Sequence, residues 1–95
     1  MSSSESFKNY VLENLKDLNG ISYRPMMGEY LLYCNGVLFG GIYDDRLLIK
    51  KTQTNAEFSL QEEIPYKGAK PMLLAEPDDK DFLINLITAT LKGIK

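Results

Sequence analysis

Apolar residues recur with a helical period at both ends of the chain. Near the start, this period predicts an amphipathic helix that presents one apolar stripe to a core. The stripe consists of Phe7, Tyr10, Val11, Leu15 and Leu18. Ser2 followed by Glu5 fits a capping box for the first turn, with Ser4 as the alternative N-cap. Asn19-Gly20 should end this helix, because glycine accepts the left-handed conformation common at helix C-termini.

A second helical pattern closes the chain. Its stripe consists of Phe82, Leu83, Leu86, Ile87, Thr90 and Leu91. Pro77-Asp78-Asp79 comes directly before this pattern. We expect Asp78 to be the N-cap, because an aspartate side chain can accept a hydrogen bond from the first turn. Gly93 should end this helix.

The segment between the two helices changes to strand patterning. Asn35-Gly36 lies between Tyr30–Cys34 and Val37–Tyr43. This is the strongest short signal for a β-hairpin, because both turn residues must accept positive φ. Asp44-Asp45 is a weaker turn of the same kind and leads into a third strand. The stretch Arg24–Lys51 therefore predicts a continuous antiparallel meander.

The segments that flank the meander are less regular. Ile21–Arg24 is expected to be an edge strand or a lead-in, since Pro25 cannot donate a ladder hydrogen bond. We expect Thr52–Glu63 to be a polar connection with a short helical turn within Asn55–Leu60. Pro71–Ala75 is expected to form a final strand.

Together these elements predict an α+β fold with two layers. Its antiparallel sheet, the meander plus one later strand, should pack with the N- and C-terminal helices. A chain of 95 residues has room for one core, so we assign residues 1–95 to a single domain.

The two-residue turns also predict a strand register. The expected pairs across the first turn are Cys34 with Val37, Leu32 with Phe39 and Tyr30 with Gly41. Those expected across the second turn are Tyr43 with Arg46 and Ile42 with Leu47. Gly40-Gly41 in mid-strand indicates either a β-bulge or the close approach of a helix backbone.

Because side chains alternate along a strand, this register sorts the meander into two faces. The nearly all-aliphatic face should receive the helices; it consists of Leu31, Tyr33, Leu38, Gly40, Ile42, Leu47 and Ile49. The other face is mixed, yet too apolar to be left to water. Its candidate interaction residues are Tyr30, Leu32, Val37, Phe39, Tyr43 and Leu48. We expect a protein partner to cover it, most simply a second copy, which would make a homodimer. The alternative is that the C-terminal segment folds over it.

Composition limits the classes of function. The formal net charge is −2 and the 11 basic residues are scattered. This argues against direct nucleic-acid binding, because phosphate contacts need clustered Lys and Arg. No apolar run reaches the ~18 residues of a membrane span, and no segment resembles a signal peptide. With Cys34 as the single cysteine, these features predict a cytoplasmic protein without a membrane segment.

The chain has no histidine. This removes Ser–His and Cys–His pairs, the usual general base near neutral pH and the commonest zinc ligand. We therefore assign no catalytic, cofactor-binding or metal-binding residues and expect no cofactor. Cys34 is interpreted as a small half-buried hydrophobe rather than a nucleophile.

One cluster leaves two alternatives open. Arg24, Met26, Glu29, Asp44 and Asp45 are expected at the mouth of the first hairpin. They could form a small binding site or an ion pair that holds the loop. Asp44-Asp45 could also simply make a turn, since aspartate accepts unusual backbone angles.

The same meander carries a family resemblance. Its residues are Arg24-Pro25-Met26-Met27-Gly28-Glu29-Tyr30-Leu31-Leu32-Tyr33, Asn35-Gly36, Phe39, Ile42, Asp44-Asp45 and Leu47 to Lys50. This ordered set resembles the N-terminal domain of TfoX/Sxy proteins, bacterial regulators of DNA-uptake competence. Met27 replaces the usual Phe of that pattern, and Glu29 replaces its second Gly. Tyr66-Lys67-Gly68 and the closing helix follow in the expected order, so the resemblance spans nearly the whole chain.

The resemblance implies a two-layer fold with the helices on one side of the sheet, and regulation through protein contacts. The competence regulators typically add a second, helical domain, and this sequence ends at Lys95 without one. The leading hypothesis is therefore a non-enzymatic regulatory or protein-interaction module. The alternative is a small-molecule-binding or catalytic domain that uses Arg24, Glu29 and Asp44.

Overall fold

The computed structural model describes residues 3–94 of the chain. The first half consists of α1 (Glu5–Asn14) and four consecutive strands, β1 (Ile21–Met26), β2 (Glu29–Cys34), β3 (Val37–Tyr43) and β4 (Arg46–Ile49). The second half consists of a short 3₁₀ turn, η1 (Ala56–Phe58), then β5 (Glu62–Glu63), β6 (Met72–Ala75) and α2 (Lys80–Gly93). The predicted helices, meander, short turn and later strand are all present, but the predicted stop of the first helix at Asn19-Gly20 was wrong, because α1 already ends at Asn14.

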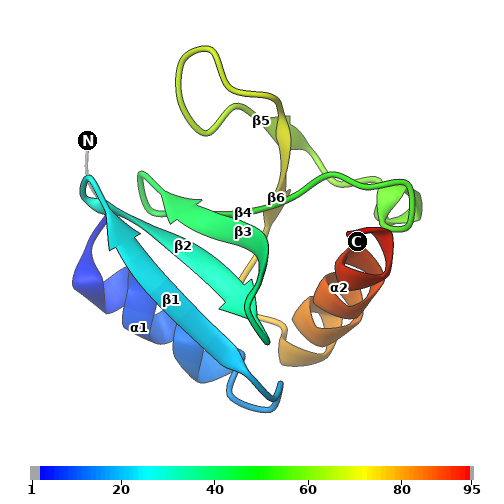
Figure 1. The fold of residues 1–95 in the computed structure, drawn as a ribbon, viewed down its shortest axis with the longest axis horizontal. Coiled ribbons are helices and arrows are strands. Elements are labelled where there is room, and N and C mark those ends of the chain that lie inside the picture. Colours follow the sequence, from blue (N-terminus) through cyan, green and yellow to red (C-terminus); the bar gives the residue numbers. More distant parts are fainter. Residues whose placement is uncertain (1–2, 95) are drawn as a thin grey trace.

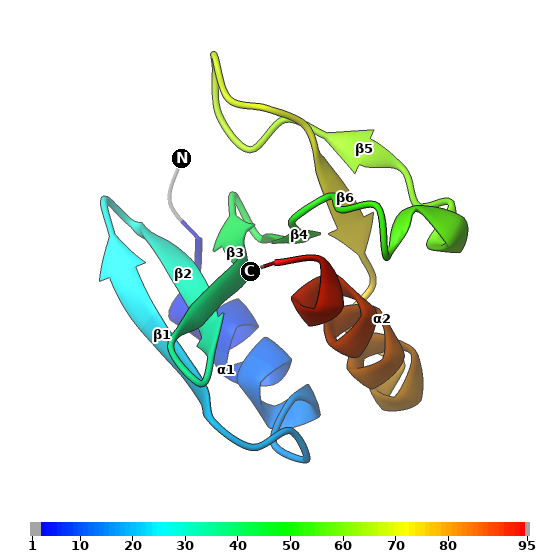
Figure 2. The same cartoon turned by 45° about the vertical axis from the view of Figure 1, so that its right-hand side comes forward.

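The six strands form one antiparallel sheet in the order β1-β2-β3-β4-β6-β5. β1 and β2 pass in front of α1, and α2 lies beside the other half of the sheet (Figures 1 and 2). Both helices share one core with the sheet. It includes Val11 and Leu15 of α1, Leu83, Leu86 and Ile87 of α2, and Leu32, Phe39, Ile42, Leu47 and Ile49 of the strands. The predicted two-layer α+β fold is confirmed, and β1 is an edge strand.

The helix caps agree with the sequence in part. Ser4 is the N-cap of α1, where its side chain accepts a hydrogen bond from the Phe7 backbone N–H at 3.1 Å; Ser2 lies outside the described residues. Asp79, not Asp78, caps α2 and accepts from the Phe82 N–H at 3.1 Å. The prediction of Asp78 was wrong because the helix begins one residue later. Asp78 instead accepts a hydrogen bond from Tyr10, 2.5 Å away.

A β-bulge changes the predicted register of the first hairpin. Cys34 pairs with Val37 as expected, but Leu32 pairs with Gly40 and Tyr30 with Ile42. The predicted pairs Leu32–Phe39 and Tyr30–Gly41 were therefore wrong, because Phe39 is an extra residue in β3. The bulge fits Gly40, where an added Cβ would lie 2.4 Å from the Leu48 carbonyl oxygen. The predicted pairs of the second hairpin, Tyr43–Arg46 and Ile42–Leu47, are confirmed.

The bulge also corrects the assignment of faces. Leu32, Phe39 and Cys34 are buried in the helix-side core, and Tyr30 packs against it. Leu31, Tyr33 and Leu38, which were expected under the helices, are half-buried on the opposite, helix-free face. The remaining predicted interaction residues differ in their exposure. Leu48 is fully buried outside the helix-side core, and Tyr43 is 7% exposed. Tyr30 is half-buried, and Val37 is 37% exposed. The predicted exposed patch is therefore not formed as one surface.

Candidate functional site

The carboxylates of the predicted binding mouth hold the start of the chain in place. Glu29 Oε1 accepts hydrogen bonds from the Ser3 N–H at 3.0 Å, the Ser3 hydroxyl at 2.6 Å and the Asp44 N–H at 3.1 Å. Asp45 Oδ1 accepts from the Ser4 N–H at 2.7 Å. Asp44 and Asp45 both have positive φ, at 54° and 56°, as a tight hairpin turn requires. These carboxylates therefore anchor the beginning of α1 to the β3–β4 turn.

In the part of the chain that the structure describes, Arg24 and Met26 of the same predicted mouth make no side-chain hydrogen bond to this network, although Met26 pairs with Glu29 across β1 and β2. Both are exposed on the edge strand β1. Arg24 borders a shallow hollow of about 260 Å³ together with Ser22, Tyr23, Tyr33 and Gly36. Among the described residues, no ion pair joins Arg24 to Glu29. The expected binding mouth is therefore not one site. Its carboxylates hold the beginning of α1, whereas Arg24 and Met26 are exposed on the edge strand β1.

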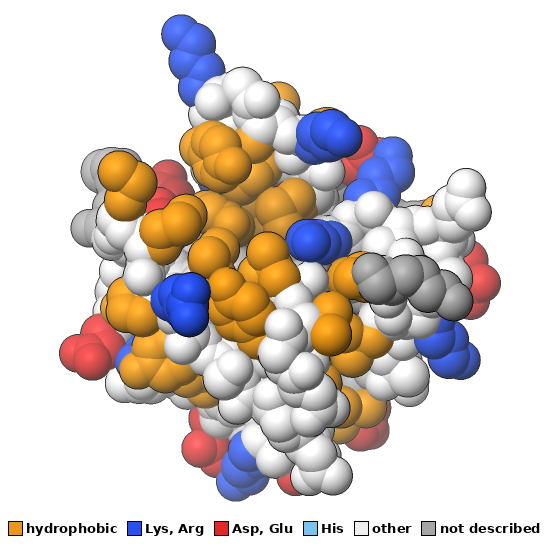
Figure 3. Space-filling model, in the orientation of Figure 1, with side chains coloured by type: hydrophobic (Ala, Val, Ile, Leu, Met, Phe, Trp, Pro, Cys, Tyr) orange, Lys and Arg blue, Asp and Glu red, His pale blue; other side chains and the backbone are white. Residues whose placement is uncertain are grey.

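A larger hollow lies on the helix-free face, beneath the connection between β5 and β6 (residues 64–71), which we call the β5–β6 loop. Its volume is about 360 Å³. The lining residues are Leu38, Gly40, Tyr43, Lys50, Lys51, Pro65, Tyr66, Ala69, Lys70, Pro71 and Met72. In the view where β1 and β2 lie in front of α1, hydrophobic side chains gather at the centre of the molecule, with Lys and Arg among and around them (Figure 3).

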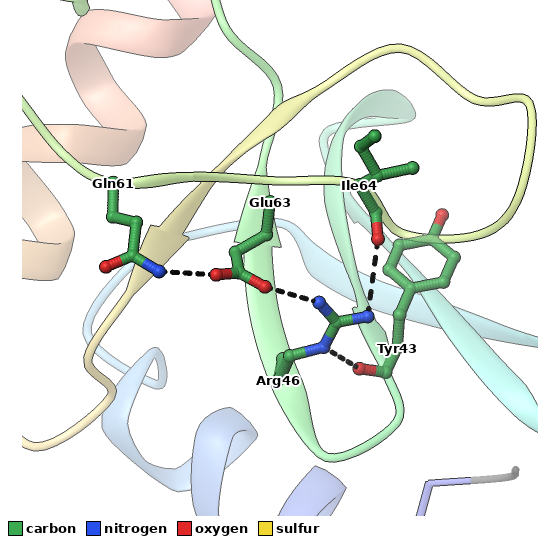
Figure 4. Close-up of polar contacts among 5 residues, drawn as sticks. All are labelled: Tyr43, Arg46, Gln61, Glu63 and Ile64. Atoms are coloured by element: carbon green, nitrogen blue, oxygen red, sulfur yellow. Dashed lines mark hydrogen bonds and ion pairs between the residues drawn. The ribbon is translucent and has the colours of Figure 1, made fainter.

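Arg46 fastens the β5–β6 loop to the sheet (Figure 4). Its guanidinium donates to Glu63 Oε1 at 2.8 Å, to the Tyr43 carbonyl at 3.2 Å and to the Ile64 carbonyl at 3.5 Å. Gln61 donates a further hydrogen bond to the second oxygen of Glu63. The planar fork of arginine suits this arrangement, because it joins one carboxylate and two carbonyls at once. Arg46 therefore positions one wall of the hollow.

Two tyrosines bring aromatic surface to the hollow. The Tyr43 ring lies close to Gly41, where an added Cβ would be 2.7 Å from a ring carbon. Tyr66 of the loop lies with its ring centre 6.1 Å from that of Tyr43, and it remains 60% exposed. Burial, with smaller contributions from nearby Tyr66 and Glu29, raises the pKa of Tyr43 above its ordinary value of 10.0. Tyr43 is therefore a neutral hydroxyl at physiological pH.

The hollow is basic, although the chain as a whole is acidic. Three of its lining residues are lysines and none is an aspartate or glutamate. Lys51 pairs with Glu62 at 2.7 Å. Neither Lys50 nor Lys70 takes part in an ion pair among the described residues. The Lys50 backbone is held on both sides, since its N–H donates to the Phe39 carbonyl at 2.9 Å and its carbonyl accepts from buried Asn55 at 2.8 Å.

Residues 13–88 match the TfoX N-terminal domain family, which covers most of the chain. A relative from Spirochaeta aurantia, an "Uncharacterized 12.7 kDa protein in trpE 5'region", is 32% identical over 78 residues, which span 80% of this chain and 68% of the relative. The chain belongs to the TfoX N-terminal domain family. This is a family of regulatory domains rather than enzymes.

Three further findings concern the described part, residues 3–94, of this TfoX N-terminal domain. Between residues 3 and 94, no group of His, Cys, Asp and Glu side chains lies close enough together to hold a metal ion. Cys34, which was expected to be half-buried, is buried, and its thiol donates to the Asn19 carbonyl at 3.4 Å. Within the same residues, no helix combines the length and apolar character needed to cross a membrane.

Sequence reasoning missed both the hollow and a buried cation. The hollow joins β3, the end of β4 and a loop some twenty residues further on, and no local pattern brings these segments together. Lys8 is only 5% exposed; its ammonium lies 4.4 Å from the Tyr23 ring centre and donates to the Tyr23 hydroxyl at 3.3 Å. Its position three residues before Val11 and seven before Leu15, on the same side of the helix, was the available signal. This contact packs β1 against α1.

Proposed function

We propose that this domain is a non-enzymatic regulatory module that binds protein through the open half of its helix-free face. The open half is the surface over β1–β3 that the β5–β6 loop leaves uncovered. The observation that carries the proposal is the apolar character of this surface. Leu31 and Tyr33 are half-buried there, Leu38 at its border also lines the hollow, and Met26 on the adjoining strand is 42% exposed. Contiguous exposed apolar surface of this kind usually marks an interaction site.

The hairpin tip beside this surface supports the same proposal. Met27 is 95% exposed and has a positive φ of 52°. That backbone conformation disfavours a methionine, and the exposed side chain gains almost no burial in return. A contact with a partner would give this side chain a role that the isolated domain does not.

The simplest partner is a second copy of the chain, as the sequence analysis expected. Three strands of about six residues cover on the order of 300 Å², from strand spacings of about 4.8 Å and rises of about 3.3 Å. Standard stable interfaces bury about 800 Å² per partner. We therefore expect a weak homodimer that forms in a cytoplasmic setting only at high concentration or alongside further contacts.

Sedimentation equilibrium across a wide concentration range tests this proposal. The average mass of the wild type should rise with concentration, and Tyr33→Ser should abolish the rise. Tyr10→Ser is the matched control, because it makes the same change at a 46% exposed site on α1. A monomeric mass for the wild type at every concentration would refute the homodimer. Equal behaviour of the two variants would refute the assignment to the open half.

A further inference from the structure

We propose that the hollow under the β5–β6 loop binds a small organic anion with a flat apolar body. This site lies beside the open half of the helix-free face but does not depend on its proposed role in protein binding. Four features of the hollow support the proposal: its size, its aromatic lining, its unbalanced charge and the hydrogen bonds that hold its walls.

The size fits a ligand of about two fused rings. The hollow measures about 360 Å³, within the usual range of about 300–1,000 Å³ for small-molecule sites. A cavity of about 150 Å³ accommodates one benzene ring. The hollow is also too small for a folded partner, so a docked protein could insert no more than a side chain there.

The apolar lining favours a flat ring system. Leu38, Met72, Pro65 and Pro71 provide aliphatic surface. Tyr66 lines the hollow and is 60% exposed, so a planar ligand could stack on its ring. Tyr43 also lines the hollow, and as a neutral phenol it adds no negative charge.

The positive charge of the hollow favours an anionic ligand. Lys50 and Lys70 line it without an ion-pair partner among the described residues, and no carboxylate lines it to balance them. A carboxylate or phosphate on the ligand would supply the missing partner through charge-assisted hydrogen bonds. The chain has 13 acidic residues against 11 basic ones, so three lysines around an apolar hollow depart from its overall balance.

Hydrogen bonds hold two parts of the wall of the hollow. Arg46 holds Glu63 at the end of β5 and Ile64 at the start of the loop, and Asn55 and Phe39 hold the backbone of Lys50. A site whose walls are already ordered loses less conformational entropy on binding. This separates the hollow from a surface groove that would have to form around its ligand.

Chemical-shift titration of the full chain tests the proposal with 2-naphthoate as the probe. Saturable shifts should concentrate on the amides of Tyr66, Lys70 and Lys50. The neutral analogue 2-naphthalenemethanol should bind about tenfold more weakly or worse, as expected for loss of a charge-assisted contact. Inorganic phosphate alone should bind far more weakly than 2-naphthoate, because it lacks the apolar body.

Variants separate the two parts of the site. Lys50→Met and Lys70→Met should each weaken 2-naphthoate about tenfold and leave 2-naphthalenemethanol nearly unchanged. Tyr66→Ala should weaken both probes. Lys16→Met is the matched control, since Lys16 is an exposed lysine of α1.

Three outcomes would overturn the proposal. They are an absence of saturable shifts, equal affinity for the charged and neutral probes, and shifts by phosphate alone that match those of 2-naphthoate. None of them bears on self-association, which the Tyr33→Ser comparison measures independently.

Discussion

The two faces of the sheet are completed in different ways. The helix side is closed by side chains from both ends of the chain, so Leu32 and Ile42 are fully buried beneath α1 and α2. On the helix-free side, Leu48 is fully buried and Tyr43 is 7% exposed, whereas Leu31, Tyr33 and Leu38 are half-exposed. One face therefore provides stability, and the other combines a hollow with an open apolar surface where binding can occur.

The charged groups show the same contrast. Glu29 and Asp45, at the β3–β4 turn, accept hydrogen bonds from Ser3 and Ser4 and are used by the fold itself. Lys50 and Lys70 have no ion-pair partner among the described residues. Charged groups that the fold satisfies are structural, whereas those it leaves unpaired beside apolar surface are the better candidates for ligand contacts.

The largest expected effect compares two neighbours in β2. Leu32→Ala should lower the free energy of unfolding by about 2–5 kcal/mol, because it opens a cavity in the fully buried core. Leu31→Ala, the same change on the helix-free face, should cost only about 1 kcal/mol. Urea denaturation of both variants measures the difference. Similar losses, or a larger loss for Leu31→Ala, would mean that the bulge at Phe39 and the resulting faces are incorrect.

Leu31 and Leu32 also show which parts of the fold the sequence could predict and which it could not. Periodicity and turn residues predicted both helices, the meander and the class of fold, since these signals are local. The faces of β2 could not be predicted in this way. A single extra residue in β3 shifts the β2–β3 register by one and turns the side chains of β2 to the opposite faces. The pattern of apolar and polar residues does not show where this extra residue lies. Gly40-Gly41 did indicate a bulge as one of two explanations, but not where it would fall.

The predicted site residues show the same difference between local and long-range contacts. The turn formed by Asp44-Asp45 was foreseen, because both residues act locally. The bonds of Glu29 and Asp45 to Ser3 and Ser4 join positions 26 and 41 residues apart. The hollow likewise depends on where a loop lies in space, and no spacing along the chain encodes that.

The next effect concerns the anchor of α1. Glu29→Ala removes the acceptor for the Ser3 and Asp44 N–H groups, and we expect a loss of about 1–2 kcal/mol in the free energy of unfolding. Glu76→Ala, at an exposed position outside this network, is the control and should change stability little. Hydrogen exchange should show faster exchange at the start of α1 in the Glu29 variant alone. Unchanged protection there would assign Glu29 no anchoring role.

A smaller effect is expected from Arg46, which joins the sheet to the start of the β5–β6 loop on the helix-free face. Arg46→Met breaks the half-buried ion pair with Glu63 and the bond to the Ile64 carbonyl. Because both partners keep some contact with water, the loss in unfolding free energy should be about 1 kcal/mol. The β5–β6 loop should become more mobile, which amide relaxation of Tyr66 and Lys67 can measure. Arg46→Lys should recover only part of the order, since one ammonium cannot replace the guanidinium fork.

The smallest effect should appear only at alkaline pH and belongs to Tyr43. Burial raises the pKa of Tyr43 in the folded state above its ordinary value of 10.0. The folded state therefore holds this proton more tightly than the unfolded chain does. The associated stability is fully present below pH 10 and is lost as pH rises through the folded-state pKa.

Tyr43→Phe has no phenol to ionise, so its unfolding midpoint in urea should fall less steeply above pH 10 than that of the wild type. Tyr66→Phe, which removes a phenol that is 60% exposed, is the comparison for a surface phenol. If Tyr66→Phe flattened the alkaline profile as much as Tyr43→Phe, burial of the Tyr43 side chain would not be the cause.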